Sequence, residues 1–254
     1  MAGCPLVDMM TKRSIVTNQL AGFNIAKMSS ADLIEYCLEH IQSKHQLLLF
    51  FANTNLIVKC QNLLSLINKS PVLIVNDGVG VDLAAMITGQ EKFPANLNGT
   101  DFHNNLALGS PRPLRMFLLG AAPGVAQRAA KHFEGLNQVI VGALDGFQGI
   151  AQANIIDIIN DANADVLMVA MGNPKQEEWI LRYAPQMNVS LITGVGALFD
   201  FYSGDRQRAP EWVQSIRMEW FYRLLQEPQR LLKRYTVDII YFLFICLKYK
   251  LRVK

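Results

Sequence analysis

Acidic and glycine-rich segments follow several apolar stretches of the sequence, and one of these segments contains Asp77. The apolar residues 71–75 end at residues 76–80, which read Asn-Asp-Gly-Val-Gly. In an open parallel sheet, ligands bind beyond the carboxyl ends of the strands, and glycines let a ligand approach the backbone. Asp77 is therefore either an acid that faces such a crevice or a cap of the next helix, and position alone favours neither role.

A second segment, residues 172–179, reads Gly-Asn-Pro-Lys-Gln-Glu-Glu-Trp after another apolar stretch. Lys175 and Gln176 would open a helix there, and the free N–H groups of a helix N-terminus suit a phosphate. The alternative is an ordinary turn in which the proline starts the helix. The polar side chains favour the binding role.

A third segment, residues 193–200, leads through Gly196 to the acid Asp200. Its glycines follow an apolar stretch in the same way, so it is expected at the same edge of the sheet. Residues 120–124 lack both the GxGxxG pattern and the Lys-Ser/Thr pair of a phosphate loop, and they indicate a packing turn.

Other common catalytic chemistries find little support. The histidines form no HExxH pattern, GxSxG is absent, and the four cysteines show no zinc spacing, so they are expected to be reduced, buried thiols. His40 and His132 are interpreted as surface residues on helices. No Asp-x-Asp occurs, so arginines, lysines or helix dipoles would neutralise a diphosphate. The sequence predicts neither a metal site nor a cofactor.

Short apolar runs alternate with stretches of helical spacing, and this alternation positions the segments above. Strands are expected at residues 47–52, 71–75, 115–119, 138–142, 166–171 and 191–194. Helices are expected at residues 30–44, 55–68, 150–163 and 176–183, and a loop at residues 94–113. Buried strands separated by helices indicate βαβ units, so we predict a Rossmann-like α/β fold with a mostly parallel sheet and flanking helices.

The charge is unevenly distributed. The 254 residues carry a net charge of +3, but residues 205–254 contain 11 Lys/Arg and 5 Asp/Glu. From Pro210 onward the pattern is amphipathic helix with interleaved aromatic and basic residues, and Pro228 is expected to start a second helix. The apolar run 237–247, flanked by bases, is too short to span a bilayer and suits an interfacial helix. We therefore expect an α/β domain over residues 1–204 and a helical, basic, membrane-associating appendage over residues 205–254.

Short blocks occur along the chain in an order typical of one family. They are residues 77–80 (DGVG), 99–101 (GTD), 119–120 (LG), 172–177 (GNPKQE), 194–196 (GVG), 199–200 (FD), 204 (G), 208–210 (RAP), 219–223 (EWFYR) and 227–230 (EPQR). The sequence resembles the WecG/TagA/CpsF glycosyltransferases (glycosyltransferase family 26). The resemblance implies an inverting, metal-independent transfer from a UDP-sugar to an undecaprenyl-diphosphate-linked saccharide in bacterial surface polysaccharide synthesis. Donor sugars of the family include N-acetylmannosamine, its uronic acid and glucose.

The resemblance also implies roles for individual residues. Asp77 matches the family's proposed general base, and Asn53 matches an active-site asparagine. With the loop residues described above, the expected donor-binding set is Gly78, Lys175, Gln176, Gly196, Asp200, Arg223, Arg230 and Lys233. In the family the appendage closes over the donor and binds membrane. The expected partners are thus the donor, the lipid-linked acceptor and an anionic membrane surface, with peripheral attachment to the cytoplasmic face of the bacterial inner membrane.

Two departures from the family pattern keep an alternative open. Phe51 stands where the family often has threonine, and residues 95–98 lack an arginine that is often present. The alternative is a non-catalytic, membrane-associated partner protein that binds a UDP-sugar or a glycolipid. Nucleic-acid binding is disfavoured because the bases flank an apolar run, and an oxidoreductase because no complete dinucleotide fingerprint occurs. The apolar last helix also allows a homo-oligomer.

Overall fold

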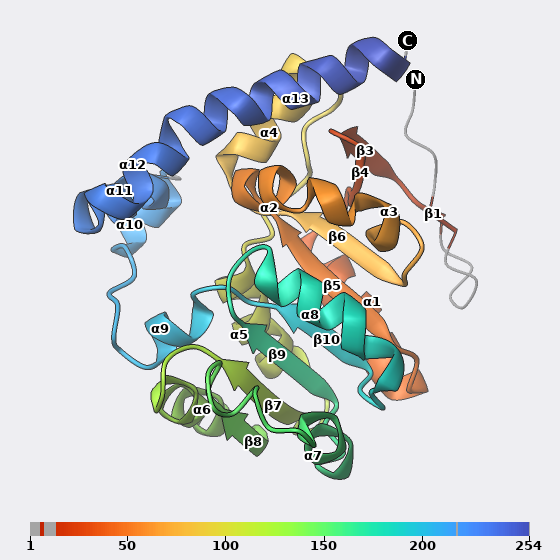
Figure 1. The fold of residues 1–254 in the computed structure, drawn as a ribbon, viewed down its shortest axis with the longest axis vertical. Coiled ribbons are helices and arrows are strands. Elements are labelled where there is room, and N and C mark those ends of the chain that lie inside the picture. Colours follow the sequence, from red (N-terminus) through yellow and green to blue (C-terminus); the bar gives the residue numbers. More distant parts are fainter. Residues whose placement is uncertain (1–5, 8–13, 217, 254) are drawn as a thin grey trace.

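An eight-stranded sheet forms the centre of the molecule (Figure 1). The computed structural model describes residues 6–7, 14–216 and 218–253, without the side chains of residues 6, 7, 215, 230, 234 and 253. The strands are β1 (Leu6–Val7), β2 (Ser14–Ile15), β3 (Thr17–Leu20), β4 (Phe23–Ala26), β5 (Leu47–Ala52), β6 (Val72–Asn76), β7 (Arg115–Gly120), β8 (Val139–Leu144), β9 (Val166–Ala170) and β10 (Leu191–Gly194). The order in the sheet is β3-β4-β6-β5-β10-β9-β7-β8, while β1 and β2 pair separately.

All neighbours in the large sheet are parallel except β3 and β4, which form an antiparallel hairpin. The mostly parallel α/β fold predicted from the sequence is confirmed, and each of the six expected strands is present. The hairpin at the edge was not expected. Its strands are four residues each, too short for a clear alternation of apolar and polar positions.

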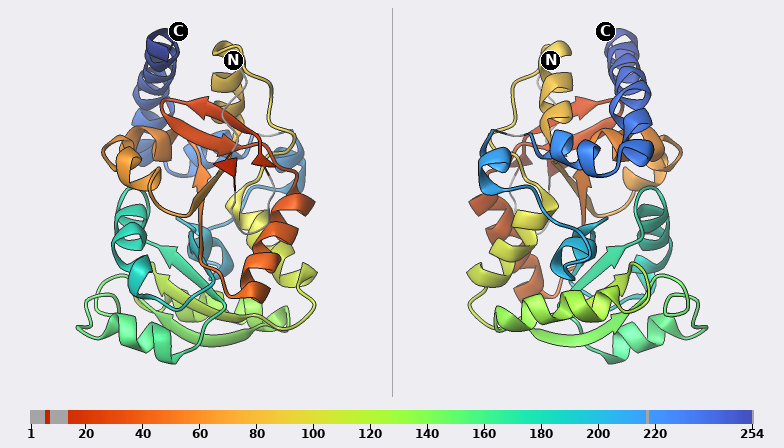
Figure 2. Two further views of the ribbon diagram at one scale, coloured as in Figure 1. Left: turned by 90° about the vertical axis from the view of Figure 1, so that its right-hand side faces the viewer. Right: turned by 90° about the vertical axis from the view of Figure 1, so that its left-hand side faces the viewer.

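Helices cover both faces of the sheet (Figures 1 and 2). They are α1 (Ser30–Ser43), α2 (Thr54–Lys59), α3 (Leu64–Ile67), α4 (Val79–Ile87), α5 (Gly99–Gly109), α6 (Val125–Gly135), α7 (Ile155–Asp161), α8 (Lys175–Tyr183) and α9 (Leu198–Tyr202). Successive residues of a strand point to opposite faces, so Leu48 and Phe50 join the core under α2 and α8, whereas Leu49 joins the core under α1 and α5. Two apolar cores therefore hold the sheet and its loops in place.

Two predicted segments differ in kind from the structure, and the helix expected at residues 150–163 is shorter, because α7 covers only Ile155–Asp161. Residues 94–113 were expected to be a loop but contain α5, because Asn98 caps the helix by accepting a hydrogen bond from the Asp101 N–H at 2.9 Å and because Phe102 and Leu106 bury one side of it. The helix expected at residues 55–68 is broken into α2, a 3₁₀ turn and α3. At the break, the Gln61 side chain donates to the Ile57 carbonyl at 3.0 Å.

The C-terminal residues form α10 (Glu211–Ser215), α11 (Glu219–Gln226), α12 (Pro228–Tyr235) and α13 (Val237–Val253). Pro228 occupies the first turn of α12, as predicted. The long helix α13 lies along α2 and also contacts α4 and β3. Its Phe242 and Cys246 are buried in the core of the α/β body, so the expected boundary after residue 204 is not a break in packing. Within the described ranges, every helix is too short or too polar to cross a membrane.

The cysteines that the structure describes are buried and unpaired, as expected. Cys37, Cys60 and Cys246 are free thiols, and burial raises the pKa of each above its usual range. Cys4 lies outside the described residues. Protonated, buried thiols pack as small apolar groups of the core.

The surface position predicted for His40 is wrong, and His132 is only partly exposed. His40 is buried, with Nδ1 2.9 Å from the Tyr36 carbonyl oxygen. His132 is partly buried and stacks on the Tyr202 ring, with 3.8 Å between the ring centroids. Both lie on helices, as expected, but each imidazole packs against a tyrosine ring, Tyr36 for His40 and Tyr202 for His132.

His103 is completely buried between two phenylalanine rings at the edge of the site described below. Its ring centroid lies 5.5 Å from that of Phe51 and 5.1 Å from that of Phe102, and Nδ1 hydrogen-bonds to the Gly99 carbonyl. Burial lowers the pKa of His103 to about 4, against the opposing effect of this hydrogen bond. The imidazole is therefore neutral at physiological pH.

Because the pKa of His103 is lower in the folded protein than in the unfolded chain, its contribution to stability is complete above pH 6.5 and is lost as the pH falls toward 4. We expect this residue to account for about 2–3 kcal/mol of the unfolding free energy lost between pH 7 and pH 4.5. Urea unfolding at both pH values should show a smaller loss in His103→Asn than in the unmodified protein. Exposed His45 provides the matched control, and an equal loss in His103→Asn and His45→Asn would contradict the assignment.

Candidate functional site

A cavity of about 970 Å³ lies at the carboxyl ends of the parallel strands. The loops after β5, β6, β7, β9 and β10 line it, and α11, α12 and α13 contribute further residues from the C-terminal part of the chain. Eight residues of the expected site lie on its wall: Asn53, Asp77, Gly78, Lys175, Gln176, Gly196, Asp200 and Arg223. The topology thus brings together segments that are far apart in the sequence.

Asp77 and Gly78 follow β6 directly and occupy the rim between β6 and β5. The Asp77 N–H donates to the Ala52 carbonyl at 2.8 Å, and the Gly78 N–H donates to Oδ1 of Asn96 at 2.7 Å. Gly78, at φ +93°, takes the N-cap position of α4, so Asp77 is not the helix cap that the sequence left as an alternative. Only glycine adopts this backbone conformation freely. Asp77 itself lies on the cavity wall.

Asn53 has a structural task as well as a place on the wall. It caps α2, because its Oδ1 accepts a hydrogen bond from the Leu56 N–H at 3.0 Å. The cap fixes the side chain at the end of β5, which is the strand next to β6. Asn53 and Asp77 therefore lie on the loops of adjacent parallel strands.

Gln176 is buried, and its amide joins the loops after β9 and β10. Oε1 accepts hydrogen bonds from the Gly172 N–H at 3.1 Å and from the Gly196 N–H at 3.0 Å. A Cβ on Gly194 would lie 2.6 Å from Nε2 of Gln176, so any larger residue at position 194 would displace the amide from its present place beside β10. The Gln176 amide oxygen thus holds the backbone of the cavity floor, and the expected role of this residue in donor binding stays a prediction.

The hydrogen-bond chain continues to the loop after β5. Nε2 of Gln176 donates to Oε1 of Glu177 at 2.8 Å, and Nδ2 of Asn173 donates to the same oxygen at 2.7 Å. Nδ2 of Asn55 in turn donates to Oδ1 of Asn173 at 3.0 Å. Burial raises the pKa of Glu177, although the two donated hydrogen bonds favour its charged form.

Glu177, Asn173 and Asn55 were not among the expected site residues. Two signals in the sequence bear on them: Glu177 and Asn173 belong to the GNPKQE block, and Asn55 follows Asn53 by two positions. Neither signal shows that a buried carboxylate joins the two loops, because residues 55 and 173 are distant in sequence. Only the fold brings them together.

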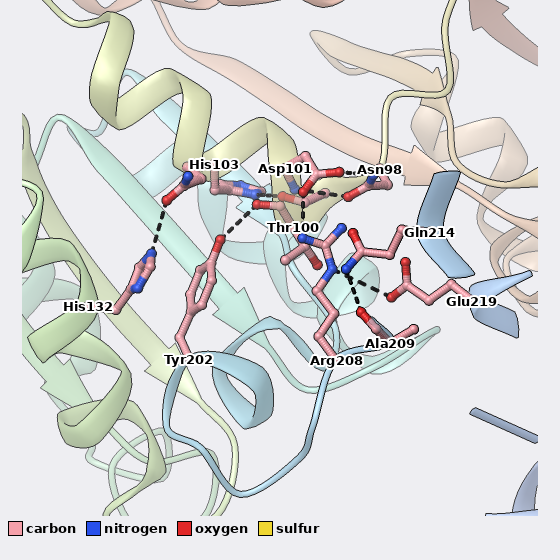
Figure 3. A network of polar contacts seen from close by, with 12 residues as sticks. Asn98, Thr100, Asp101, His103, His132, Tyr202, Arg208, Ala209, Gln214 and Glu219 are labelled. Atoms are coloured by element: carbon pink, nitrogen blue, oxygen red, sulfur yellow. Dashed lines mark hydrogen bonds and ion pairs between the residues drawn. The ribbon is translucent and has the colours of Figure 1, made fainter. Parts of the chain in front are cut away.

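Asp101 and Glu219 hold the guanidinium group of Arg208, which lines the cavity (Figure 3). Arg208 pairs with Asp101 at 2.6 Å, and its Nε lies 3.8 Å from Oε1 of Glu219. The same Glu219 oxygen lies 3.3 Å from Nη2 of Arg223, whose guanidinium also lies over the Phe201 ring at 4.6 Å. Burial raises the pKa of Asp101, but the hydrogen bonds from Arg208 and Asn98 outweigh burial and lower it overall.

Both arginines keep unused hydrogen-bonding capacity. The Nε atoms of Arg208 and Arg223 are buried and make no hydrogen bond to any part of the chain that the structure describes. Because both residues line the cavity, their guanidinium groups place positive charge where an anion could bind. Arg208 belongs to the RAP block but was not assigned a role from the sequence.

Of the other predicted donor-binding residues, Asp200 and Lys175 line the cavity, whereas Lys233 does not. Asp200 pairs with Arg206 at 3.1 Å, and Arg206 also pairs with Glu227. Lys175 is exposed at the start of α8, on the cavity rim. Lys233 is exposed on α12 and is absent from the cavity lining, whereas the side chain of Arg230 lies outside the described part of the structure.

Both positions at which the sequence departs from the family pattern, Phe51 and residues 95–98, contribute residues to the cavity lining. Phe51 lines the cavity and packs on Phe102, with 5.5 Å between the ring centroids, and Asn96 receives the Gly78 N–H. Among the residues whose positions the structure describes, no group of three or more His, Cys, Asp or Glu side chains is placed to hold a metal ion. Of the charged groups lining the cavity, the cationic ones are Lys175, Arg208 and Arg223.

Comparison with known proteins identifies the family. Residues 18–254 match the sequence model of the family described as "Glycosyl transferase WecG/TagA/CpsF family". The chain belongs to this glycosyltransferase family. The match includes both the α/β body and the C-terminal helices, so the expectation drawn from the short sequence blocks is confirmed.

Two curated relatives of this WecG/TagA/CpsF protein are bacterial enzymes. A protein of Bacillus subtilis (strain 168) is 32% identical over 167 residues, which are 64% of this chain and 64% of the relative. A protein of Bacillus spizizenii (strain ATCC 23059 / NRRL B-14472 / W23) is 32% identical over 167 residues, 64% of this chain and 63% of the relative. Both are named N-acetylglucosaminyldiphosphoundecaprenol N-acetyl-beta-D-mannosaminyltransferase. The matched segment thus spans less than two thirds of the length of either relative.

The role of Gln176 predicts a large effect of its removal. Gln176→Met should lower the unfolding free energy by about 2–3 kcal/mol, because two backbone N–H groups and the buried Glu177 carboxylate lose a partner. Gln186 is exposed, so Gln186→Met should change it by less than about 0.5 kcal/mol. Urea unfolding of the two variants measures the difference. Equal stabilities would contradict the role of Gln176 in joining the loops.

Proposed function

We propose that this WecG/TagA/CpsF protein transfers a sugar from a UDP-sugar to an undecaprenyl-diphosphate-linked saccharide. The observation that carries the proposal is the placement of the Asp77 carboxylate and of Arg208 and Arg223 on the wall of one cavity. Such a cavity offers a base for an acceptor hydroxyl and cations for a departing diphosphate. The names of the two relatives favour N-acetylmannosamine over its uronic acid or glucose as the donor sugar.

In the proposed mechanism, Asp77 accepts the proton of the acceptor hydroxyl as its oxygen attacks the anomeric carbon. The attack comes from the face opposite UDP, so the bond to the diphosphate breaks and the anomeric configuration inverts. Arg223 and Arg208 stabilise the charge that develops on the diphosphate, which gives this site a way to act without a metal ion. Lys175, at the N-terminus of α8, is the further cation on the rim.

Replacing the proposed base tests the reaction directly. Asp77→Asn should lower kcat by about 10²–10⁴-fold, because the amide cannot accept the proton, whereas UDP should bind as before. Exposed Asp157 on α7 gives the matched control Asp157→Asn, which should be fully active. UDP release and calorimetric UDP binding measure the two properties. Near-normal turnover by Asp77→Asn would rule out Asp77 as the base.

The donor side of the site is tested separately. Arg223→Gln should weaken UDP binding by about 10–100-fold, because a charge-assisted contact with the diphosphate is lost. Arg182, exposed in the last turn of α8, supplies the matched control Arg182→Gln. Isothermal titration with UDP measures both. Unchanged UDP affinity of Arg223→Gln would place the diphosphate elsewhere in the cavity. The role of Arg230 and Lys233 as further donor-binding cations stays a prediction.

We also propose that residues 205–254 attach the protein peripherally to the cytoplasmic face of the bacterial inner membrane. The C-terminal helices expose large apolar side chains that would meet the bilayer: Trp212, Ile216, Phe221, Leu225, Leu232, Ile240, Phe244 and Leu251. Basic residues lie among them, as in helices that bind anionic lipid surfaces. The division into a catalytic domain over 1–204 and an appendage remains part of this proposal, although α13 shares the core of the body.

A further inference from the structure

The helix α4, outside the C-terminal segment, also exposes an apolar side. Val79, Leu83, Met86 and Ile87 are each between 41% and 52% exposed. Successive members of this group are four, three and one residues apart, so they lie on one side of the helix. Asp82 is the one charged residue of α4, and it is buried. A helix side with four large apolar residues and no charge indicates contact with another apolar phase or partner.

This apolar side begins at the cavity. α4 starts directly after Asp77 and Gly78, and its Val79 and Leu83 line the cavity. Across the cavity, α13 contributes Ile239 and Leu243 to the lining. The two helices are in contact and lie side by side at one end of the molecule (Figure 2). The cavity therefore has an apolar wall on each of two helices that extend beyond it.

Positive charge lies at the far end of the same pair of helices. α13 carries Lys248, Lys250 and Arg252 in its last turns, near the exposed Leu247 and Leu251. The ammonium group of Lys250 reaches Gly89, just beyond the end of α4. Exposed apolar side chains with basic residues beside them suit a surface of anionic lipid more than a neutral protein partner.

We propose that α4 is a second lipid-contacting helix and that the polyprenyl chain of the acceptor leaves the cavity between α4 and α13. The proposal rests on the proposed function, because only a lipid-linked acceptor has such a chain. The acceptor hydroxyl must reach Asp77 while the polyprenyl chain stays in the bilayer. α4 joins these two places, since Val79 is two residues from Asp77 and the apolar side continues to Ile87.

The double variant Met86→Gln/Ile87→Gln tests the proposal, because neither residue lines the cavity. With the undecaprenyl-linked acceptor in vesicles of phosphatidylcholine and phosphatidylglycerol, its KM should rise about tenfold. With a short-chain, water-soluble acceptor of the same saccharide diphosphate, its KM should match that of the unmodified protein, which also shows that the variant folds. Leu108, exposed on α5, gives the control Leu108→Gln, which should behave as the unmodified protein with both acceptors.

Flotation with the same vesicles, read independently of sugar transfer, should show weaker binding of the α4 variant than of Leu108→Gln. Flotation equal to that of the control, or equal KM values for the long-chain acceptor, would overturn the proposal. Loss of an oligomer in light scattering with unchanged flotation would also overturn it, in favour of an interface between two copies of the chain. Absence of transfer by the unmodified protein to either acceptor would contradict the proposed function instead, and flotation would still decide whether α4 contacts lipid.

Discussion

The side-chain amide of Gln176 fixes the geometry on which the cavity depends. One carbonyl oxygen accepts the N–H groups of Gly172 and Gly196, so the loops after β9 and β10 cannot move independently. Through Glu177, Asn173 and Asn55, the same set of hydrogen bonds reaches the loop after β5. A buried amide that makes three hydrogen bonds is costly to disturb, because removing it leaves the Glu177 carboxylate and two backbone N–H groups without that partner. The cavity floor is thereby prearranged for a ligand.

The wall opposite this floor comes from the other end of the sequence. Arg208 joins α5 to α11 through Asp101 and Glu219, and α13 is anchored by Phe242 and Cys246 in the core of the body. The basic residues of segment 205–254 thus fall into two groups, one that lines the cavity and one that is exposed on the surface. Arg208 and Arg223 face the cavity, whereas residues such as Lys233 are exposed. In the proposed function, the first group meets the donor diphosphate and the second meets the membrane.

The sequence was sufficient to predict the parallel sheet, since buried strands in α/β proteins are continuous apolar runs that need no knowledge of their partners. It also placed Asp77, Gly78 and Gly196 at the strand ends, because strand ends in a parallel sheet share one edge. It could not give the role of Gln176, which depends on two glycine N–H groups that only the fold brings within 3.1 Å of one oxygen. The helix α5 was missed because asparagine, glycine and proline suggest a loop, although Asn98 in fact caps the helix.

Product analysis tests the central claim most directly. The unmodified protein is incubated with a panel of UDP-sugars and a synthetic undecaprenyl-diphosphate-linked N-acetylglucosamine, and the lipid products are examined by mass spectrometry. The predicted result is an acceptor heavier by one sugar residue, formed with UDP-N-acetylmannosamine and accompanied by an equal amount of UDP. An acceptor of unchanged mass with every UDP-sugar, while the protein still binds UDP, would contradict the claim and favour a non-catalytic binding protein.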